Sequence, residues 1–370
     1  MPSRNVTSRD VARKAGVSRT TVSFVLNNVE EANISEETRQ RVLEAAQALG
    51  YVPHAAAQVL AGQRTRMVGL IIPPDRRHLP SHLFLLPLME GMLYVVQQHG
   101  LRLLIDSPGD DSHTRTYLDL VRAKRLDGLI MFEPRLDDPA LQALAEDGFP
   151  LVLIGHLPGA EICSVDVDNR AAARMAVDHL LQLGHRRICC ITNAPQSSYT
   201  ATAERLLGYQ DALNAAGLPH DPALVQFADY TPDSGFECMN TLLDQLSPPP
   251  TAAFVASDVV AFGALSAIQQ RGLRVPQDIA VAGFDDVPFA RFANPPLTTV
   301  RLPIAQQGHK AAELLLDLIL MRAEAGRRVL LDTELVVRGS TAAASPPDSA
   351  PANIPSLPTD TPESRGGHNG

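Results

Sequence analysis

The sequence has few cysteines, and none stands in a pattern that binds metal or forms a redox pair. Among 370 residues there are four cysteines, with no CxxC pair and no His/Cys cluster at the spacing of metal ligands. Buried, reduced thiols are therefore expected, which fits the reducing interior of a cell. No metal and no cofactor is predicted. The four residues are Cys163, Cys189, Cys190 and Cys238.

Long apolar runs are also missing. No stretch of about 18 apolar residues occurs, and residues 1–10 are polar and charged without an apolar signal core. Neither secretion nor membrane insertion is expected, and the prediction is a soluble cytoplasmic protein. No repeat of about 20 to 50 residues is visible, which excludes solenoids and propellers.

Familiar catalytic motifs are absent. There is no GxGxxG after the first predicted strand, no GKS/T phosphate loop and no GxSxG elbow. His156, His179 and His185 have no nucleophile at motif spacing, so structural roles are expected for them. The sequence therefore favours a binding protein over an enzyme.

Charge is distributed unevenly along the chain. The formal net charge is −9, which by itself argues against a nucleic-acid partner. Residues 1–66 nevertheless hold nine Lys/Arg against six Asp/Glu, a balance of +3, while the remaining residues hold 23 against 35. Only the N-terminal segment suits phosphates, and its surplus is small, so useful DNA binding is expected to need two copies.

The chain divides by composition into a helical N-terminal segment, a long α/β region and a tail. Residues 342–370 are rich in Pro, Ser, Ala and Gly, so we expect a disordered tail. Between 67 and 341, short apolar runs alternate with amphipathic stretches, which predicts parallel strands covered by helices. The predicted strands are 68–72, 101–105, 128–132, 151–154, 188–191, 253–256 and 279–283.

The α/β region is large for one sheet. We therefore expect an α/β fold with a small all-α head and a body of two doubly wound parallel-sheet subdomains. The predicted division is 67–163 with 295–325 for one subdomain and 164–294 with 326–341 for the other. Such a body would bind a small ligand in a cleft at the carboxyl ends of its strands.

Residues 8–27 read as two short helices joined by a tight turn. Gly16 stands where the turn needs a positive φ or close backbone contact, Val17 enters the core, and Ser18 is placed to cap the second helix. The opposite face of that helix is predicted to be exposed and to meet base edges in a major groove. The buried positions are Val11, Ala12, Ala15, Val22, Val25 and Leu26, and the exposed ones are Arg19, Thr20, Ser23, Phe24 and Asn27.

A third helix completes a minimal core. It runs from Ile34 to Leu49, with Ser35 as N-cap and Gly50 as terminator. The head is assigned to residues 1–53, followed by a hinge helix and linker at 54–66. The Ala-rich hinge is too short to be a stable helix alone, so we expect it to fold on DNA.

The stretches VARKAGVS, TVSFVLN and ISEETRQRVLEAAQALGYVPH resemble the head and hinge of the lac repressor family. The likeness continues in Asp168-Asn169, GHRRI at 184–188, RLLGY at 205–209, Ser257-Asp258, GFDD at 283–286 and PPLTTVR at 295–301. It implies a periplasmic-binding-protein-like body. Nearly the whole chain is covered, apart from the C-terminal tail.

This resemblance implies a homodimer, sometimes a tetramer, that binds a nearly palindromic operator in double-stranded DNA. It also implies that Leu60 of each subunit wedges into the central minor-groove step and kinks the duplex. The alternative for Leu60 is a linker residue that packs on the neighbouring domain. The residues expected to contact DNA are Thr7, Ser18, Arg19, Thr20, Ser23, Phe24, Asn27, His54 and Leu60.

Phe24 departs from the family pattern. Many members carry an arginine at this place on the recognition helix, and an aromatic ring makes no bidentate contact with guanine. It can instead touch a thymine methyl group or pack on sugar. The operator is therefore expected to differ from those of better-known relatives.

The resemblance also places a small-molecule effector, a sugar or related metabolite, in the cleft. A guanidinium there binds hydroxyls or a carboxylate, and an aspartate after a strand accepts hydrogen bonds. Arg205 and Asp285 have a structural salt bridge or cap as their alternative, and for Asp258 a capping role is favoured. The predicted effector residues are Arg205, Tyr230, Ser257, Asp285, His82 and Phe84.

The hypothesis that follows is an allosteric repressor in which the effector alters closure of the subdomains and the spacing of the paired hinges. Two rivals remain. A solute-binding protein that feeds a transporter would share the body but needs a signal sequence and no basic head. A sugar-processing enzyme would need catalytic groups that are not identifiable here.

Overall fold

In the computed structural model, the residues described are 6–26, 32–51, 64–72, 83–107, 113–136, 138–193 and 199–341. They divide into two compact units, one of residues 1–68 with 119–127 and one of 69–118 with 128–370. The first contains the helical head, and the second contains most of the body. Each is described by itself below.

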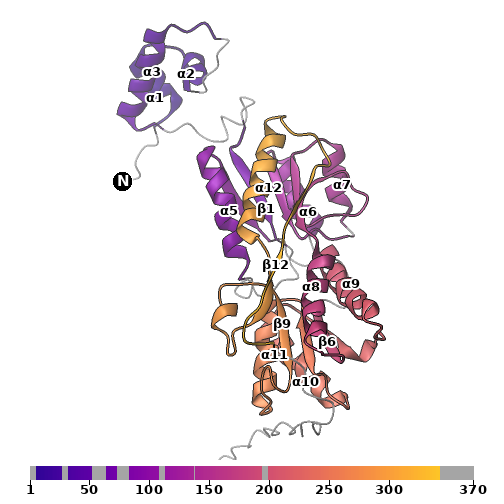
Figure 1. The fold of residues 1–370 in the computed structure, drawn as a ribbon. Helices are drawn as coiled ribbons and strands as arrows, with labels where there is room; N and C mark the ends of the chain where they lie inside the picture. Colours follow the sequence, from indigo (N-terminus) through magenta and orange to yellow (C-terminus); the bar gives the residue numbers. More distant parts are fainter. Residues whose placement is uncertain are drawn as a thin grey trace, which may run out of the picture. The chain divides into compact units, whose positions relative to one another are not determined.

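The head is a bundle of three helices, α1 (Ser8–Ala15), α2 (Arg19–Leu26) and α3 (Glu36–Leu49) (Figure 1). Local signals fix their ends as predicted. Gly16 and Gly50 adopt φ of 68° and 61°, and the hydroxyl oxygens of Ser18 and Ser35 accept hydrogen bonds from Thr21 N and Thr38 N. The predicted apolar faces meet in one core. Its fully buried members are Val11, Val22 and Val42.

One sheet of the body has the strand order β11-β5-β4-β3-β1-β2. The pairs β3–β4, β4–β5 and β5–β11 are parallel. In Figure 1 this sheet lies among α5, α6, α7 and α12. The strands are β1 (Met67–Ile71), β2 (Arg102–Asp106), β3 (Gly128–Phe132), β4 (Leu151–Ile154), β5 (Cys163–Val167) and β11 (Arg328–Leu331), and the helices are α5 (Leu85–Gln98), α6 (His113–Arg122), α7 (Pro139–Glu146) and α12 (Ile304–Ile319).

The other sheet has the order β12-β10-β9-β8-β6-β7. Its pairs are parallel except at one edge, where β12 runs antiparallel to β10. Short 3-10 turns at Pro222–Leu224 and Ala290–Phe292 complete the subdomain. The strands are β6 (Ile188–Asn193), β7 (Val225–Ala228), β8 (Ala252–Val255), β9 (Ala280–Asp285), β10 (Thr298–Arg301) and β12 (Glu334–Val336), and the helices are α8 (Asn169–Gln182), α9 (Thr200–Ala215), α10 (Pro232–Gln245) and α11 (Asp258–Gln270).

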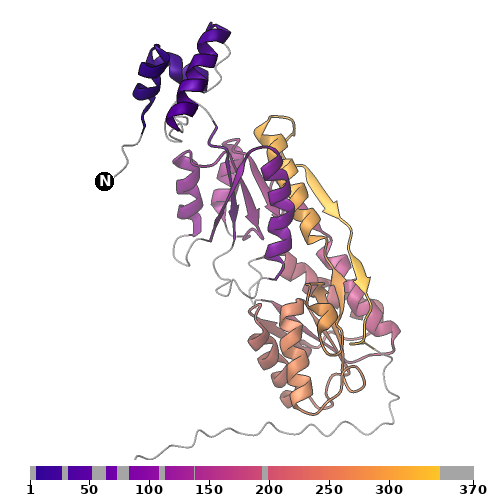
Figure 2. The same ribbon diagram turned by 90° about the vertical axis from the view of Figure 1, so that its left-hand side faces the viewer.

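The predicted fold class is confirmed, but the predicted division of the body needs correction. β5 pairs with β4, so the first crossing follows Val167 rather than residue 163. β10 pairs with β9 in the second sheet and β11 with β5 in the first, which reverses the predicted assignments of 295–301 and 328–331. The chain returns between β10 and α12 and crosses once more between β11 and β12, and Figure 2 shows the yellow C-terminal strands running from one subdomain to the other.

Glycines let three helix pairs pack backbone against backbone. A Cβ added at Gly308 of α12 would lie 2.0 Å from Leu88 O of α5, and one at Gly91 would lie 1.9 Å from Ala305 O. Gly208 and Gly263 are as tightly enclosed between α8 and α9 and between α10 and α11. Because real Cβ atoms are never so close to backbone, these pairs require glycine at the crossing.

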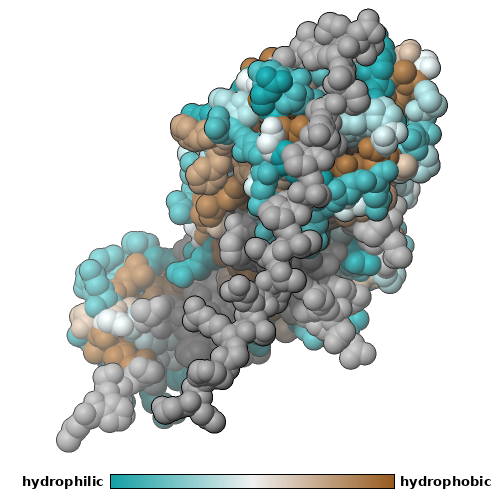
Figure 3. All heavy atoms as spheres, turned by 90° about the horizontal axis from the view of Figure 1, so that it is seen from below, coloured by the Kyte–Doolittle hydropathy of each residue, from teal (hydrophilic) through white to brown (hydrophobic). Residues whose placement is uncertain are grey.

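Several predictions fall outside the described residues. They concern most of the hinge helix, including His54 and Leu60, as well as Asn27, His82 and the tail at 342–370. Within the described ranges, no helix has the length and apolar character needed to span a bilayer. On the face shown in Figure 3, hydrophilic and apolar residues are interspersed.

Candidate DNA-reading helix and effector cleft

The second helix of the head presents a mixed polar and aromatic surface. Arg19, Thr20 and Ser23 are exposed on α2, and Phe24 keeps 39% of its surface accessible. The opposite face contributes Val22 and Val25 to the head core. Core packing therefore leaves the predicted reading residues pointing outward.

The residues at the helix starts of the head also have local roles. Ser18 caps α2 through Thr21 N at 3.0 Å. Thr7 precedes α1, where its backbone N and its hydroxyl both donate to Asp10 Oδ2, at 3.0 and 2.6 Å. Both hydroxyls thus stabilise helix N-termini, whose remaining N–H groups suit an anion such as phosphate.

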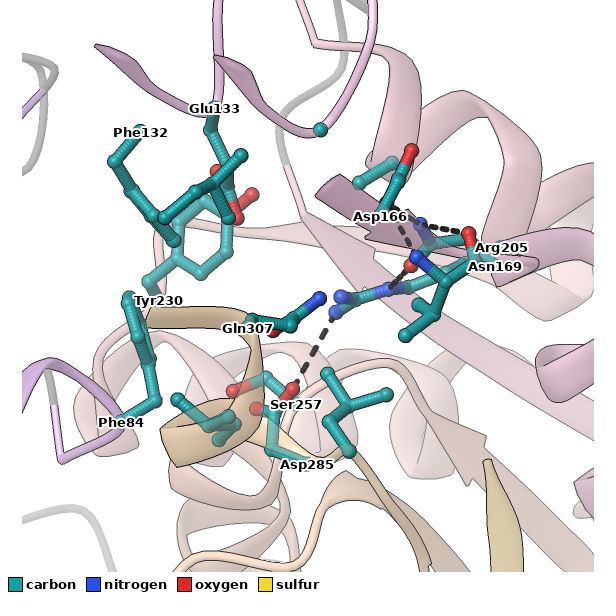
Figure 4. A pocket seen from close by; sticks show the side chains of 16 residues that line it. Phe84, Phe132, Glu133, Asp166, Asn169, Arg205, Tyr230, Ser257, Asp285 and Gln307 are labelled. Atoms are coloured by element: carbon teal, nitrogen blue, oxygen red, sulfur yellow. Dashed lines mark hydrogen bonds and ion pairs between the residues drawn. The ribbon is translucent and has the colours of Figure 1, made fainter. Parts of the chain in front are cut away.

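A cleft of about 590 Å³, open solvent included, lies where the carboxyl ends of both sheets meet. Residues at or just after the ends of β3, β4 and β5 face residues that follow β7, β8 and β9 (Figure 4). This is the position that open parallel sheets provide for ligands. The lining residues are Phe84, Phe132, Glu133, Ile154, Gly155, Asp166, Val167, Asn169, Ala201, Arg205, Tyr230, Ser257, Asp285, Leu302, Ile304 and Gln307.

Arg205, on α9, is the cation among the described residues that line the cleft, and it is only 7% exposed. Its Nε donates to Asn169 Oδ1 at 3.0 Å and its Nη1 to Ala256 O at 2.8 Å. The guanidinium carbon lies 4.1 Å from the centroid of the Phe284 ring. The side chain is thereby held in one orientation, and among the described residues its Nη2 has no hydrogen-bond partner.

Asp285 ends β9 and lies 3.7 Å from Arg205 Nη1. Its φ of 115° is unusual for a residue with a side chain, and Tyr230 (69°) and Glu133 (45°) are two further cleft residues with positive φ. Such backbone conformations cost of order 1–3 kcal/mol and cluster at binding sites. Each of these three residues lies at or just after the end of a strand and lines the cleft.

Ser257 and Asp258 begin α11 but have different surroundings. Ser257 lines the cleft and its hydroxyl does not cap the helix. Asp258 is fully buried and accepts hydrogen bonds from Thr299 Oγ1 at 2.6 Å and Val287 N at 2.9 Å. Burial, reinforced by the charge of Asp285, raises the pKa of the Asp258 carboxyl well above its ordinary value. Asp258 thus joins β10 and the loop after β9 to α11 by hydrogen bonds. This role is structural, but it is not the helix-capping role that the sequence favours.

Gly283 explains part of the GFDD motif. A Cβ at this position would lie 2.3 Å from Asp258 Oδ1. Only glycine therefore lets β9 pass the buried carboxylate that holds the following loop.

The first subdomain supplies an aromatic wall. Phe84 stacks on Phe132 with ring centroids 5.1 Å apart. Tyr230 lines the cleft from the second subdomain, and its hydroxyl lies 3.1 Å from Thr202 Oγ1. Apolar rings with a few polar groups between them are the usual lining of small-molecule sites.

The structure brings five predicted cleft residues together and adds others. Arg205, Tyr230, Ser257, Asp285 and Phe84 line one cavity, whereas His82 lies outside the described residues. Glu133 was missed although it directly follows a predicted strand, and Asn169 was missed although it belongs to a motif used for the resemblance. Gln307 had no sequence signal, because it reaches the cleft from α12, far along the chain.

The three singled-out histidines all have polar neighbours. His185 is buried with Nδ1 3.1 Å from Thr251 Oγ1, and His179 Nε2 lies 3.0 Å from Thr341 Oγ1. Burial lowers the pKa of His179, and the nearby His185 lowers it further. His156 lies between two carboxylates. Among the residues with described positions, no group of His, Cys, Asp and Glu is arranged to hold a metal ion.

Comparisons with known proteins cover nearly all of this architecture. A model of bacterial regulatory proteins of the lacI family matches residues 7–54, and one of the periplasmic binding protein-like domain matches residues 177–341. The HTH-type transcriptional regulator CelR of Thermobifida fusca is 36% identical over 340 residues, which are 91% of this chain and 98% of the relative.

Solved structures agree. A CelR–cellobiose complex matches with a TM-score of 0.70 and 35% identity, over 90% of this chain and 99% of that one. A lac repressor dimer bound to operator and the anti-inducer ONPF matches with a TM-score of 0.79 and 30% identity, over 92% of this chain and 100% of that one. With its helix-turn-helix head and its two-sheet body, the chain belongs to the lacI family of DNA-binding transcriptional regulators.

Proposed function

We propose that this protein is a repressor that binds a nearly palindromic operator as a homodimer. A small molecule that enters the cleft would lower or raise its affinity for the operator. The observation that carries the proposal is the cleft at the carboxyl ends of both sheets, in a chain that also bears a DNA-reading head. A ligand held by both walls changes how they close, which is the differential interaction that allostery requires.

For DNA recognition, we assign base contacts to Arg19, Thr20, Ser23 and Phe24 on the exposed face of α2. Thr7 and Ser18, at the starts of α1 and α2, are assigned to backbone phosphates, and Asn27 and His54 to further DNA contacts. Leu60 is proposed as the minor-groove wedge. The last three side chains lie outside the described residues.

Two features support a homodimer. The basic surplus of residues 1–66 is only +3, so one head neutralises few phosphates. The body also exposes large apolar side chains to solvent. Among them are Phe292 (71%), Leu86 (69%) and Tyr94 (59%). Pairing two chains would cover apolar surface of this kind and place two heads on one operator.

The cleft favours an uncharged, polyhydroxylated effector such as a sugar. Among the described residues, Glu133, Asp166 and Asp285 line it, together with the guanidinium of Arg205. Carboxylates accept hydrogen bonds from hydroxyls but repel anionic ligands, and the rings of Phe84 and Tyr230 offer apolar faces. The solved complex of CelR with cellobiose supports this ligand class. We expect binding without turnover.

Genome-wide mapping of bound sites, followed by calorimetry of the full chain with metabolites of the neighbouring genes, tests the proposal. Bound sites should share an inverted repeat, and at least one such metabolite should bind and change operator affinity. Absence of inverted-repeat sites would contradict dimeric operator binding, and binding without any change in operator affinity would contradict the allosteric role.

The wedge role of Leu60 has its own test. Leu60→Ala should weaken operator binding strongly while effector affinity of the free protein stays nearly intact. The matched control is Leu43→Ala, which truncates a 43% exposed leucine on α3 and should change operator affinity little. Equal operator affinity of Leu60→Ala and wild type would leave the linker role as the explanation.

A further inference from the structure

Besides the three chain crossings, side chains tie the two subdomains together beside the cleft. The hydroxyl of Thr200, in the first turn of α9, donates to the carbonyl oxygen of His156 at 2.6 Å. Tyr199 forms an isolated antiparallel bridge with Arg135, which follows β3. The start of α9 in the second subdomain is thus docked on loops of the first.

An imidazole lies at the centre of this contact. His156 Nδ1 is 2.8 Å from Asp166 Oδ2, and His156 Nε2 is 3.5 Å from Glu204 Oε1. Asp166 is on β5 in the first subdomain and Glu204 is on α9 in the second. The His156 side chain is only 15% exposed and Glu204 25%, so solvent screens the contact incompletely.

The same group of residues reaches the effector cleft. Asp166 Oδ1 accepts a hydrogen bond from Asn169 Nδ2 at 3.3 Å, and Asn169 Oδ1 accepts one from Arg205 Nε at 3.0 Å. Arg205 follows Glu204 directly on α9. The contacts that start at His156 and pass through Asp166 and Asn169 therefore lead back to the residue next to Glu204. Asp166 and Asn169 are therefore positioning residues for the cleft guanidinium, and Figure 4 shows them beside it.

The contact between His156 Nε2 and the Glu204 carboxyl group is a hydrogen bond only if one of the two atoms carries a proton. A neutral imidazole has one N–H, and the short distance to Asp166 assigns it to Nδ1. The lone pair of Nε2 then faces the carboxylate of Glu204, and neither group can donate. One additional proton on the Glu204 carboxyl turns this unfavourable contact into a favourable one, because the carboxyl group then donates to Nε2.

The surroundings favour uptake of that proton. Burial raises the pKa of Glu204, an effect that Asp166 and Asp168 reinforce and that His156 and Arg328 oppose. The charged groups facing His156 are Asp166 from β5, Glu204 from α9 and Arg328 from β11, whose Nη2 lies 3.5 Å from His156 Nδ1.

We propose that His156 and Glu204 form a proton-dependent clasp between the two subdomains, connected to Arg205 through Asp166 and Asn169. Lower pH favours the clasped arrangement, because the clasped state binds one more proton than the open state. The clasp itself does not depend on the identity of a ligand. Its influence on effector affinity rests on the proposed function, because Arg205 is the residue through which it would act.

The test measures subdomain closure in the full chain without effector or DNA. Donor and acceptor dyes on Gln142→Cys in α7 and Gln270→Cys in α11 would report single-molecule transfer efficiency from pH 8.5 down to 4.5, the ordinary pKa of a glutamate, because the Glu204 pKa is raised above that value. Both sites are exposed and the four native cysteines are buried, and dilution with unlabelled chain keeps one labelled pair per assembly. The closed-to-open ratio should rise about threefold to tenfold per pH unit near the transition, as one coupled proton dictates.

Glu204→Gln removes the dependence on the proton, because an amide donates to a neutral imidazole and accepts from a charged one. Its closed-to-open ratio should stay constant over the pH range. Glu237→Gln makes the same chemical change on an exposed position of α10 and should respond as wild type does. His156→Gln replaces the ring by an amide that can donate to the Glu204 carboxylate, so it should also lose the response, and circular dichroism verifies that each variant is folded.

A wild-type ratio that does not change with pH, or a Glu204→Gln response equal to that of wild type, overturns the clasp. These outcomes leave the proposed function standing, because neither effector nor operator is in the experiment. A pH-dependent clasp in a protein that binds no effector would instead contradict the proposed function alone.

Discussion

The DNA-reading helix and the effector cleft differ in how far apart along the chain their residues lie. Every assigned residue on α2 falls between Arg19 and Phe24, on one face of one short helix. The cleft gathers side chains from Phe84 to Gln307, on helices and strand ends of both subdomains. One site is local and the other is assembled by topology.

This difference determines how each site tolerates change. A side chain on the exposed face of α2 is held by its own helix, so replacing it alters recognition while the core remains. In the cleft, Arg205 joins Asn169, Ala256 and Asp285 from separate elements, so replacing it disturbs several of them at once. Stability and ligand binding are therefore coupled in the cleft and largely separate on α2.

The largest predicted effect breaks the cleft network. Arg205→Ala removes the guanidinium 3.7 Å from Asp285 together with its hydrogen bonds to Asn169 and Ala256, and should reduce the free energy of unfolding of the body by about 3 kcal/mol in urea titrations. Arg170→Ala on α8 is the control, because that guanidinium is half exposed and bonded to Asp211. Similar losses for both variants would mean that the cleft is not held together as described.

The next prediction concerns the packing that positions the cleft walls. Gly308→Ala places a Cβ against Leu88 O and should destabilise the body by about 2 kcal/mol, seen as a lower midpoint in calorimetry. Gly339→Ala, whose nearest neighbours lie at an ordinary 3.4 Å, should leave the midpoint nearly unchanged. If Gly308→Ala is equally neutral, α5 and α12 do not need their close approach.

A smaller change should be confined to the head. Ser18→Ala removes the acceptor for Thr21 N and should cost about 1 kcal/mol of head stability. The unfolding of the body should not move, and Ser18→Asp should restore the head because a carboxylate also caps. A body that shifts together with the head would show that the two regions are not energetically separate.

The smallest effect on stability is expected at Phe24. Phe24→Arg should change the free energy of unfolding by less than about 0.5 kcal/mol, because the ring is partly exposed and outside the core. It should shift the selected operator towards guanine, whereas Phe24→Leu should retain the wild-type preference. In vitro selection of bound DNA measures both, and an unchanged preference for Phe24→Arg would remove Phe24 from base reading.

Strand prediction succeeded for runs dominated by apolar residues and failed for several short or mixed strands. β3, β4 and β8 read as uninterrupted apolar runs and were located. β11 and β12, at the sheet edges, are only partly buried. β5 contains Ser164 and Asp166 although it is buried, so its pattern resembles a loop. Missing β5, β10 and β11 caused the error in the predicted subdomain boundaries.

The sequence by itself determined the helix-turn-helix, its caps and its outward-facing residues, because each depends on neighbours within a turn or two of helix. It also determined the family, through motifs spread along the chain. Only the tertiary structure decided which strand joins which sheet, why Gly283 and Gly308 must be glycine, and how His156 comes to lie between Asp166 and Glu204. These depend on contacts between distant segments, and local propensity contains no information about them.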